Sequence, residues 1–300
     1  MMRQLFLFLS TQKGMRKWME TSPVAQKLTR RFIAGETLED ELAVCARLAS
    51  NKISSTLDHL GENVTTLNEA AASRDAYLTA LHKIQKRQLP STVSIKLTQF
   101  GIDLSQEACL ENVLALSQRA IESGTSIEID MESTEYTDRT LAIVEKIGTA
   151  RAVIQAYLYR SAADIERLNS LNIPVRLCKG AYNEPASVAF PGKRDVDQNY
   201  LKLMKLLLDK GTYPAIASHD ETILGEAFRY ARERKIAPEK FEFQMLYGIR
   251  NDLQQRIIDL GYRLRVYVPY GVAWYPYFMR RLAERPANAL FLAKNVFKGN

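Results

Sequence analysis

The 300-residue chain contains few of the residues that build disulfide frameworks or metal sites. Its three cysteines, Cys45, Cys109 and Cys178, lie far apart and form no CxxC pair. It has three histidines, and none of them has the spacing of an HExxH zinc motif. We therefore expect neither structural disulfides nor a bound metal, and free thiols fit a reducing compartment.

The absence of several other motifs argues against particular classes of protein. No stretch reaches the roughly 18 apolar residues that a membrane-spanning helix needs. No GxGxxG or P-loop follows an apolar run, which argues against a doubly wound open sheet, the main alternative fold. Basic and acidic residues are interleaved, and no zinc-finger or RNP-like motif is present, so we expect no nucleic-acid partner.

The chain starts with an apolar run, LFLFL, that lacks a small-residue cleavage site, so a helix is expected there rather than a signal peptide. Lys13, Arg16, Lys17 and Trp18 follow it. Such a helix either lies on a membrane surface or packs against the protein, and both interpretations stay open. The net charge of +7 suits an anionic ligand or surface, and it is also typical of an ordinary solvated surface.

The chain does contain a series of short apolar runs that end on polar residues. They are VSIKL, SIEID, AVIQAYL, VRLCKG, AIASHD, FEFQML and RLRVYVP. A strand that is buried on both faces reads as a continuous apolar run, and a polar side chain at its end needs a partner. When many strands share this pattern, we expect a common site at the carboxyl ends of a parallel sheet or barrel.

Amphipathic, helix-like stretches separate these runs. The predicted strands cover about 52–58, 93–98, 126–130, 152–158, 174–179, 214–218, 241–246 and 264–268. The predicted helices between and after them cover about 68–88, 105–122, 137–147, 162–171, 196–210, 222–235, 251–260 and 275–285. Eight strands that are each followed by a helix predict a distorted (β/α)8, TIM-like barrel of the α/β class.

The first 50 residues are expected to contain helices only. One covers residues 2–19, a second begins at Ser22-Pro23, and a third follows Thr37. We therefore expect residues 1–50 to form an N-terminal helical segment and residues 51–300 to form the barrel domain.

Two of the predicted strand ends carry charged side chains that need partners. Lys96 lies in an apolar strand, where its ammonium group either clamps a carboxylate or phosphate or belongs to a structural ion pair. Asp130 ends the run SIEID, and it could pair with a basic residue, a substrate amine or a loop amide.

The segment RLCKGAYNEP is more informative. It places Arg176 and Lys179 on either side of Cys178, and Gly180 and Ala181 follow. Small residues allow a ligand to approach the backbone closely, so two cations beside such a turn suit an anionic cofactor. A surface loop with ordinary basic residues is the alternative.

Two adjacent arginines, Arg280 and Arg281, stand in YPYFMRRLAERP. The helix dipole alone can explain basic residues near a helix end, but a helix across the barrel mouth would aim both at a ligand carboxylate. Tyr267 and the aromatic residues after it suit either stacking on a flat ring or packing beneath the barrel rim.

The order of these motifs resembles that of the proline dehydrogenase family. The series ISSTLDHLGE, VSIKLTQFG, IEIDME, IQAYLYR, VRLCKGAYNEP, ASHD, FEFQMLYG and RVYVPYG–YFMRRLAE covers about residues 50–290. The motifs VRLxKGAY, EFQMLYG and RRLAE are specific together, because no single physical constraint would produce all three. The resemblance is to the short monofunctional bacterial form and to the corresponding domain of bifunctional proline utilisation proteins.

This resemblance implies an enzyme with FAD at the carboxyl ends of the barrel strands and the last helix above the barrel mouth. It implies oxidation of L-proline to Δ1-pyrroline-5-carboxylate, with hydride passing from proline C5 to flavin N5 and electrons passing to a quinone. A pyrroline-5-carboxylate dehydrogenase is a further candidate partner. The alternatives are a barrel that acts on hydroxyproline and a non-catalytic barrel that binds an anion. We expect a cytoplasmic protein, or one that is peripheral at the inner face of the membrane.

The resemblance also assigns residues to the site. Arg176, the basic residue near flavin N5, and Lys96 take catalytic roles. The implied FAD contacts are Gln155, Arg176, Cys178, Lys179, Gly180, Ala181, Tyr182, His219, Gln244, Leu246, Arg281 and Glu284. The implied substrate contacts are Lys96, Asp130, Leu246, Tyr267, Arg280 and Arg281.

Glu62 and Arg280 are the implied gate that closes the site, with Asp130 as a further acidic partner. One departure concerns Asp220, which follows His219 where some family members have asparagine. A carboxylate near a pyrophosphate or ribose would alter that contact. No residue stands out as the base for the substrate amine.

Overall fold

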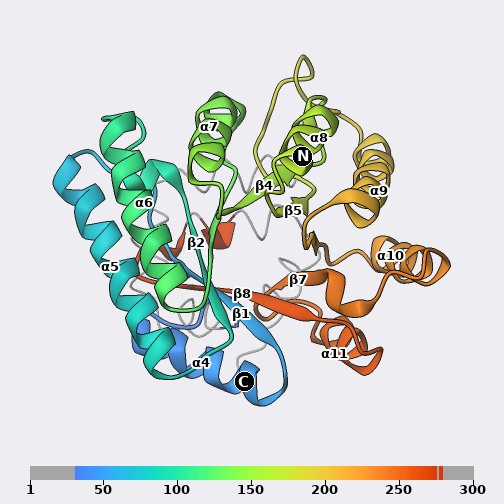
Figure 1. Cartoon of the computed structure of the whole chain (residues 1–300), viewed down its shortest axis with the longest axis horizontal. Coiled ribbons are helices and arrows are strands. Elements are labelled where there is room, and N and C mark those ends of the chain that lie inside the picture. Colours follow the sequence, from blue (N-terminus) through green and yellow to red (C-terminus); the bar gives the residue numbers. More distant parts are fainter. Residues whose placement is uncertain (1–30, 276, 280–300) are drawn as a thin grey trace, which may run out of the picture.

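The computed structural model describes residues 31–275 and 277–279, and its eight parallel strands close into a barrel (Figure 1). The strands follow one another around the barrel in sequence order, and β8 pairs with β1. Their bounds are β1 Ser54–His59, β2 Ser91–Ile95, β3 Ile127–Ile129, β4 Arg151–Gln155, β5 Val175–Cys178, β6 Ala215–Ala217, β7 Glu242–Leu246 and β8 Leu264–Tyr270. The predicted eight-stranded α/β barrel is thereby confirmed.

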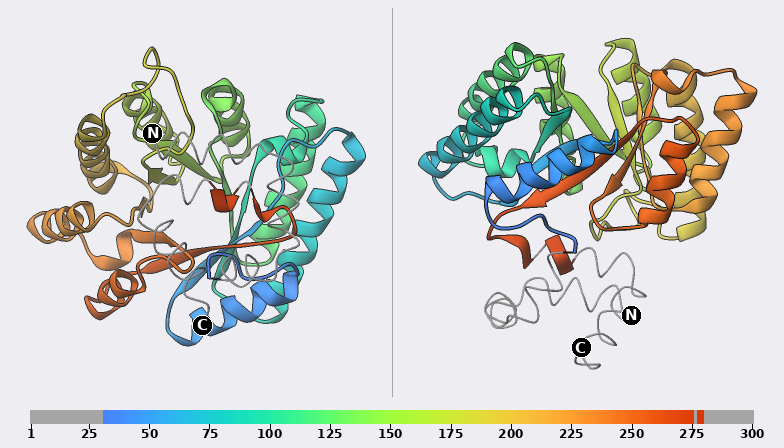
Figure 2. Two further views of the ribbon diagram at one scale, coloured as in Figure 1. Left: turned by 180° about the vertical axis from the view of Figure 1, so that it is seen from behind. Right: turned by 90° about the horizontal axis from the view of Figure 1, so that it is seen from below.

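Helices surround the barrel and connect successive strands (Figures 1 and 2). They are α4 Leu38–Ser50, α5 Leu67–Lys86, α6 Gln106–Glu122, α7 Thr137–Ile147, α8 Ser161–Ser170, α9 Lys193–Lys210, α10 Glu221–Glu233 and α11 Asn251–Asp259. The 3-10 turns η1 Leu97–Phe100, η2 Thr134–Tyr136 and η3 Pro238–Lys240 lie in the connections.

Side-chain caps fix where two of the helices begin. At α4, the Thr37 hydroxyl accepts a hydrogen bond from the Asp40 backbone N–H, and the Asp40 carboxylate accepts one from the Thr37 N–H. Thr66 and Glu69 form the same capping box at α5. Each box satisfies backbone donors that a helix start leaves unpaired. The helix predicted after Thr37 is confirmed, whereas the two helices predicted before it lie outside the described residues.

Several strands are shorter than predicted, and for β4 the structure shows the reason. The expected strand over 152–158 ends at Gln155, because residues 156–157 turn and Leu158 forms an isolated antiparallel bridge with Ala189. The apolar run AVIQAYL continues through the turn because Tyr157 and Leu158 are buried there in a small cluster of their own. An apolar run therefore marked burial at this point without marking the end of the strand.

The two faces of the strands differ in polarity. Apolar side chains such as Leu57, Ile95 and Val266 are buried in the core that the surrounding helices cover. Their neighbours along the strands, such as Thr56 and Ser94, are equally buried but take part in polar contacts across the barrel. Since side chains alternate between the two faces of a strand, the barrel interior is polar although the strands contain apolar runs.

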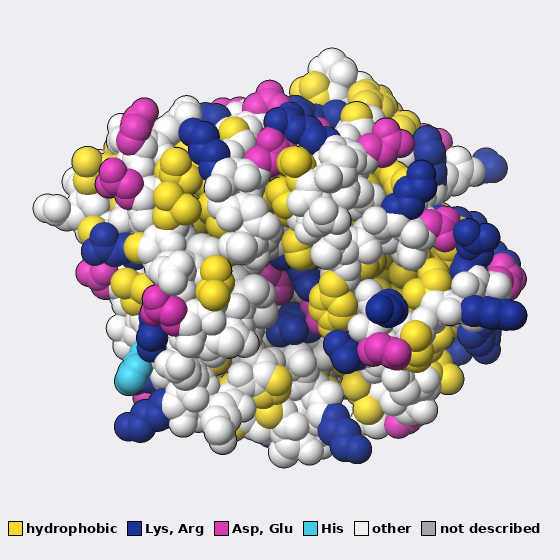
Figure 3. All heavy atoms as spheres, viewed as in Figure 1, with side chains coloured by type: hydrophobic (Ala, Val, Ile, Leu, Met, Phe, Trp, Pro, Cys, Tyr) yellow, Lys and Arg dark blue, Asp and Glu magenta, His cyan; other side chains and the backbone are white. Residues whose placement is uncertain are grey.

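All strands are parallel, so their carboxyl ends meet at one end of the barrel. The described residues that follow β8, 271–275 and 277–279, lie at this end (Figure 2). Figure 3 views the opposite end, where basic and acidic side chains are visible in a central hollow. Charged side chains therefore extend through the barrel to its amino-terminal end.

Candidate active site

Three side chains from different strands meet at the carboxyl ends of the barrel. Lys96 directly follows β2, Asp130 directly follows β3, and Tyr267 lies in β8. The Tyr267 hydroxyl donates a hydrogen bond of 2.7 Å to Asp130 Oδ2, and Lys96 Nζ lies 3.3 Å from the same oxygen. Lys96 Nζ also lies 3.5 Å from the Tyr267 hydroxyl oxygen. The structure thus brings together three residues that the sequence assigned to one site, and Asp130 pairs with basic residues.

A second carboxylate completes the surroundings of Lys96. Asp58 in β1 is fully buried, and its Oδ1 atom lies 3.1 Å from Lys96 Nζ. Burial lowers the pKa of an ammonium group, but Asp58 and Asp130 raise that of Lys96 above its ordinary value, so Lys96 remains charged. Sequence reasoning missed Asp58. A carboxylate inside the strand run ISSTLDH was the available signal, because a buried charge needs a partner.

Arg176 in β5 extends into the middle of the barrel, where four strands supply its partners. Its guanidinium donates to Ser94 Oγ at 2.9 Å and to Gln244 Oε1 at 3.2 Å. It pairs with Asp130 and lies 3.4 Å from Glu128 Oε2. Its central carbon lies 5.4 Å from the centre of the Tyr267 ring. Burial lowers the pKa of Arg176, but the two carboxylates raise it above its ordinary value, which keeps a fixed positive charge at the site.

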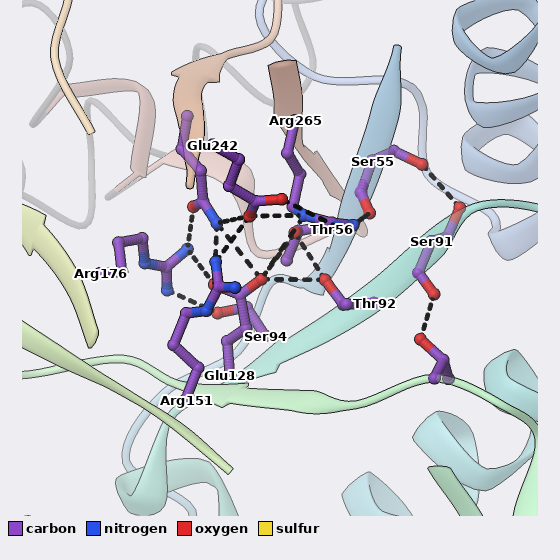
Figure 4. A network of polar contacts seen from close by, with 12 residues as sticks. Ser55, Thr56, Ser91, Thr92, Ser94, Glu128, Arg151, Arg176, Glu242 and Arg265 are labelled. Atoms are coloured by element: carbon purple, nitrogen blue, oxygen red, sulfur yellow. Dashed lines mark hydrogen bonds and ion pairs between the residues drawn. The ribbon is translucent and has the colours of Figure 1, made fainter. Parts of the chain in front are cut away.

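Beneath Arg176 the barrel contains a layer of buried ionic residues (Figure 4). Glu242 Oε1 lies 2.6 Å from Arg151 and 2.9 Å from Arg265. Gln244 donates to Glu242 at 2.8 Å and to Glu128 at 3.2 Å, and it accepts from Arg176. Gln244 was predicted to contact the cofactor, and the structure places it inside this network. None of the four ionic residues was predicted from the sequence.

Lys179 lies at the barrel rim, whereas Arg176 extends into the barrel interior. Strand β5 ends at Cys178, so Lys179 begins the loop, and its Nζ atom lies 2.5 Å from Asp197 and 2.9 Å from Asp220. Asp220 is the N-cap residue of α10 and accepts from the Thr222 backbone N–H. Lys179 is therefore a partly exposed cation at the barrel rim, held by carboxylates on two helices.

The turn after Lys179 requires glycine. Gly180 has φ of +110°, a backbone angle that residues other than glycine rarely adopt. A Cβ atom at this position would lie 2.4 Å from the ring of Tyr157, well inside van der Waals contact. The backbone thus packs directly on an aromatic ring, and this contact fixes the loop that continues through Ala181 and Tyr182.

The other predicted cofactor residues lie around the same rim. Gln155 donates to the Glu132 carbonyl at 2.8 Å, and His219 Nε2 accepts from the Leu246 N–H at 2.9 Å. The Cys178 thiol contacts the Ile154 carbonyl at 3.6 Å. Gln155 is buried, while Cys178, Lys179, Gly180, Ala181, Tyr182, His219 and Leu246 are partly exposed.

Apolar side chains cover one side of the mouth. Tyr267 packs in a cluster with residues from the segment before α4 and the segment after β8, and Leu246 packs against it. The cluster also contains Phe32, Ile33, Leu60, Ile249, Trp274, Tyr275, Tyr277, Phe278 and Met279. The aromatic residues after β8 thus pack against the mouth of the barrel.

Some predicted residues cannot be placed in this arrangement. Arg280, Arg281 and Glu284 lie outside the described residues. Glu62 is partly exposed in the loop between β1 and α5. The predicted gate of Glu62 and Arg280 therefore stays a prediction.

Comparisons with known proteins agree on one family. A family model described as proline dehydrogenase matches residues 42–294. Proline dehydrogenase 1 of Bacillus subtilis (strain 168) is 43% identical over 305 residues, which cover 99% of this chain and 100% of that protein. The proline dehydrogenase of Deinococcus radiodurans is 39% identical over 281 residues, or 91% of each chain.

A solved structure supports the same relationship. It is the proline utilization A protein from Bdellovibrio bacteriovorus inactivated by N-propargylglycine, with a TM-score of 0.80 and 28% identity. The match covers 86% of this chain and 32% of that chain. This chain thus spans about a third of that longer protein and nearly all of the two relatives above.

Proposed function

Because the chain belongs to the proline dehydrogenase family, we propose that its barrel mouth holds FAD and L-proline next to each other, with Arg176 and Lys96 facing them. The enzyme oxidises L-proline to Δ1-pyrroline-5-carboxylate, and it is flavin-dependent like its family. The observation that carries the proposal is the convergence of Lys96, Asp130, Arg176 and Tyr267 at the carboxyl ends of four parallel strands. This is the end of a (β/α)8 barrel at which active sites lie.

The residues around the rim fit FAD by their chemistry. Lys179 is a partly exposed cation suited to an anionic group, and the Gly180 turn brings backbone close to a ligand. Gln155, Cys178, Ala181, Tyr182, His219, Gln244 and Leu246 are the other described residues that we assign to the cofactor, and Arg281 and Glu284 complete the set. The bound flavin would supply the redox chemistry by accepting a hydride.

Lys96 is assigned to the substrate carboxylate together with Arg280 and Arg281. Its ammonium is charged and held by two carboxylates, so its position is fixed before the substrate arrives. Leu246 and Tyr267 would form the wall against the proline ring. Fixing the carboxylate at one end and the ring at the other orients the reacting carbon, which makes the transfer effectively unimolecular.

Arg176 contributes charge rather than proton transfer. Its guanidinium is buried and retains its proton, so it provides a fixed positive charge where negative charge develops during hydride transfer. Asp130 links the two halves of the site, because it contacts both Arg176 and Lys96. We assign no residue as the base for the substrate amine.

The electron acceptor is proposed to be a membrane quinone. Within the described residues, no helix has the length and apolar character needed to cross a bilayer. We propose that residues 1–50, ahead of a barrel domain over residues 51–300, make any peripheral contact with the membrane. A pyrroline-5-carboxylate dehydrogenase is a candidate partner, because it would consume the product.

Two experiments test this function. Purified protein should be yellow, with flavin absorbance, and should reduce a dye or quinone acceptor when L-proline is added. A colourless, folded protein that does not take up FAD would contradict the proposal. Replacing Arg280 or Arg281 by methionine should raise KM for proline by the equivalent of about 2–4 kcal/mol. An unchanged KM in both variants would remove the two arginines from the clamp.

A further inference from the structure

The reaction as proposed leaves several buried charges without a role. Glu128, Glu242 and Arg151 are buried inside the barrel, and Arg265 is nearly so (Figure 4). Burying four charges is expensive, and replacing such groups by apolar residues is often neutral or stabilising.

Glu128 is the member of this layer that pairs with Arg176. Its Oε2 atom lies 3.4 Å from the Arg176 guanidinium and 4.0 Å from that of Arg151. Its Oε1 atom accepts from the Thr56 hydroxyl at 3.1 Å and from the Thr92 hydroxyl at 3.0 Å. These contacts come from other strands of the barrel and hold the Glu128 carboxylate in one place.

Gln244 strengthens the connection between Glu128 and Arg176. Its amide nitrogen donates to Glu128, so its amide oxygen faces the other way and accepts from Arg176. Because lysine and arginine side chains can only donate and carboxylates can only accept, the orientation of this amide is determined. The guanidinium of Arg176 is therefore held from below by its ion pair with Glu128 and by its hydrogen bond to Gln244, whose amide nitrogen donates to both Glu128 and Glu242.

The two counter-ions of Arg176 differ in their surroundings. The side chain of Asp130 is 16% exposed, and it is shared with Lys96 and Tyr267 at the mouth. The side chain of Glu128 is 1% exposed, and apart from Arg176 it contacts residues inside the barrel, such as Thr56, Thr92 and Gln244. Asp130 is therefore accessible to a ligand at the mouth, whereas the Glu128 carboxylate is shielded from it.

Electrostatics agrees with a permanently charged Glu128. Burial raises its pKa, but the nearby guanidinium groups of Arg176, Arg151 and Arg265 bring the pKa below its ordinary value. Glu128 is thus ionised at neutral pH, and its charge partly neutralises that of Arg176.

We propose that Glu128 is a positioning residue for Arg176: it holds the guanidinium in place from beneath and limits the positive charge that the hydride acceptor experiences. This inference rests on the proposed function, because it takes Arg176 to lie beside the flavin. Under this proposal the buried layer affects how readily the flavin is reduced, and Glu128 is the residue through which the layer contacts Arg176.

The test compares two carboxylates of the same layer. Glu128→Gln removes the charge next to Arg176, while Glu242→Gln removes a charge that contacts Arg151 and Arg265 but not Arg176 in the described contacts. The readout is the reduction equilibrium of the bound flavin against a reference dye. More positive charge favours the reduced, anionic flavin. Glu128→Gln should favour reduction about tenfold, which is about 30 mV for a two-electron couple. Glu242→Gln should shift it much less.

Steady-state kinetics provides a second readout. Glu128→Gln should change kcat more than KM for proline, because the substrate carboxylate is held by other residues. Equal shifts of the equilibrium in the two variants, or none in Glu128→Gln, would overturn the proposal. If Glu128→Gln does not fold, Glu128→Asp keeps the charge but withdraws it from Arg176, and a smaller shift of the same sign is expected. Failure of the wild type to bind flavin would instead refute the proposed function.

Discussion

The ammonium nitrogen of Lys96 lies 3.1 Å from Oδ1 of Asp58, in an ion pair that is almost completely buried. Asp58 comes from β1 and Lys96 directly follows β2, so the pair connects neighbouring strands at the carboxyl end of the barrel. Within the described residues, the second Asp58 oxygen has no hydrogen-bond partner. The Asp58 carboxylate therefore helps to hold the Lys96 ammonium, the charge that we assign to the substrate.

Asp58→Asn should destabilise the protein. The substitution removes one of two counter-ions from a buried ammonium, and Asp130 remains as the other. We expect a loss of about 1–3 kcal/mol in the free energy of unfolding, below the cost of breaking an isolated buried pair. Urea denaturation of the flavin-loaded protein measures this loss. The control is Glu39→Gln, an exposed carboxylate that pairs with Lys83 and Arg87 and should have little effect. Equal stability of the two variants would contradict a structural role for Asp58.

Glu41→Gln should change how stability depends on pH. Burial, together with the nearby charge of Asp58, raises the pKa of Glu41 well above its ordinary value of 4.5. Its stabilising contribution is thus fully present below that value and is lost as pH rises towards the folded-state pKa. Between pH 4.5 and the folded-state pKa, ionisation of Glu41 alone should lower the free energy of unfolding by about 1.4 kcal/mol per pH unit. Glutamine cannot ionise, and its oxygen can still accept from the Asp58 N–H.

Urea unfolding of both proteins at about pH 5 and about pH 8 measures this effect. As pH rises, the free energy of unfolding of the variant should increase relative to that of the wild type. Parallel pH profiles would show that Glu41 is already ionised in the folded protein, against the direction of its pKa shift.

Gly180→Ala should destabilise the loop that follows β5 and weaken flavin uptake. The substitution places a Cβ atom against the Tyr157 ring and strains a backbone with positive φ. A loss of about 1–3 kcal/mol is expected from the backbone alone. Gly225 in α10 is the matched control, because a Cβ atom there would meet no described atom within 4 Å apart from its chain neighbours and the nearby backbone of its own helix. Gly225→Ala should stabilise by about 0.5–1 kcal/mol. Thermal unfolding and flavin titration of both variants decide the point.

Tyr267→Ser should relax discrimination against trans-4-hydroxy-L-proline. Removing the ring opens space at the proposed wall, so activity on proline falls and the relative activity on the hydroxylated ring rises by about tenfold. Tyr267→Phe is the control, because it keeps the wall and loses only the hydroxyl that contacts Asp130. The ratio of kcat/KM for the two substrates is the measurement. An unchanged ratio in Tyr267→Ser would remove this residue from the site.

Removal of residues 2–18 should weaken binding to anionic vesicles. The segment combines an apolar run with basic residues, and such a composition favours an anionic surface in a salt-sensitive way. Co-sedimentation with vesicles at low and high salt measures the effect. If full-length and truncated proteins sediment alike, the membrane contact lies elsewhere.

Much of the fold could be predicted from local patterns. A helix was predicted after Thr37, and the capping box that Thr37 forms with Asp40 at the start of α4 is local in sequence. The apolar runs predicted all eight strands because burial on both faces leaves a signal in every strand. The exception, Leu158, carried the same signal for a different reason, since it is buried in a turn.

Part of the site could also be predicted from the sequence. Lys96, Asp130 and Tyr267 each interrupt an apolar run near its end, and parallel strands bring such ends together whatever the order of the strands. The match to family motifs then assigned them chemical roles that the pattern alone left open.

The sequence by itself therefore determined the eight strands of the barrel and the residues that gather at its mouth, because these leave a local signal in each strand. Only the tertiary structure decided which charges meet. Asp58 and Lys96 are 38 residues apart, and Glu128 and Gln244 are 116 apart. Alternation along a strand tells which side chains face inward, but their partners across the barrel depend on the register of all eight strands. For the same reason, only the tertiary structure shows the charged layer beneath Arg176.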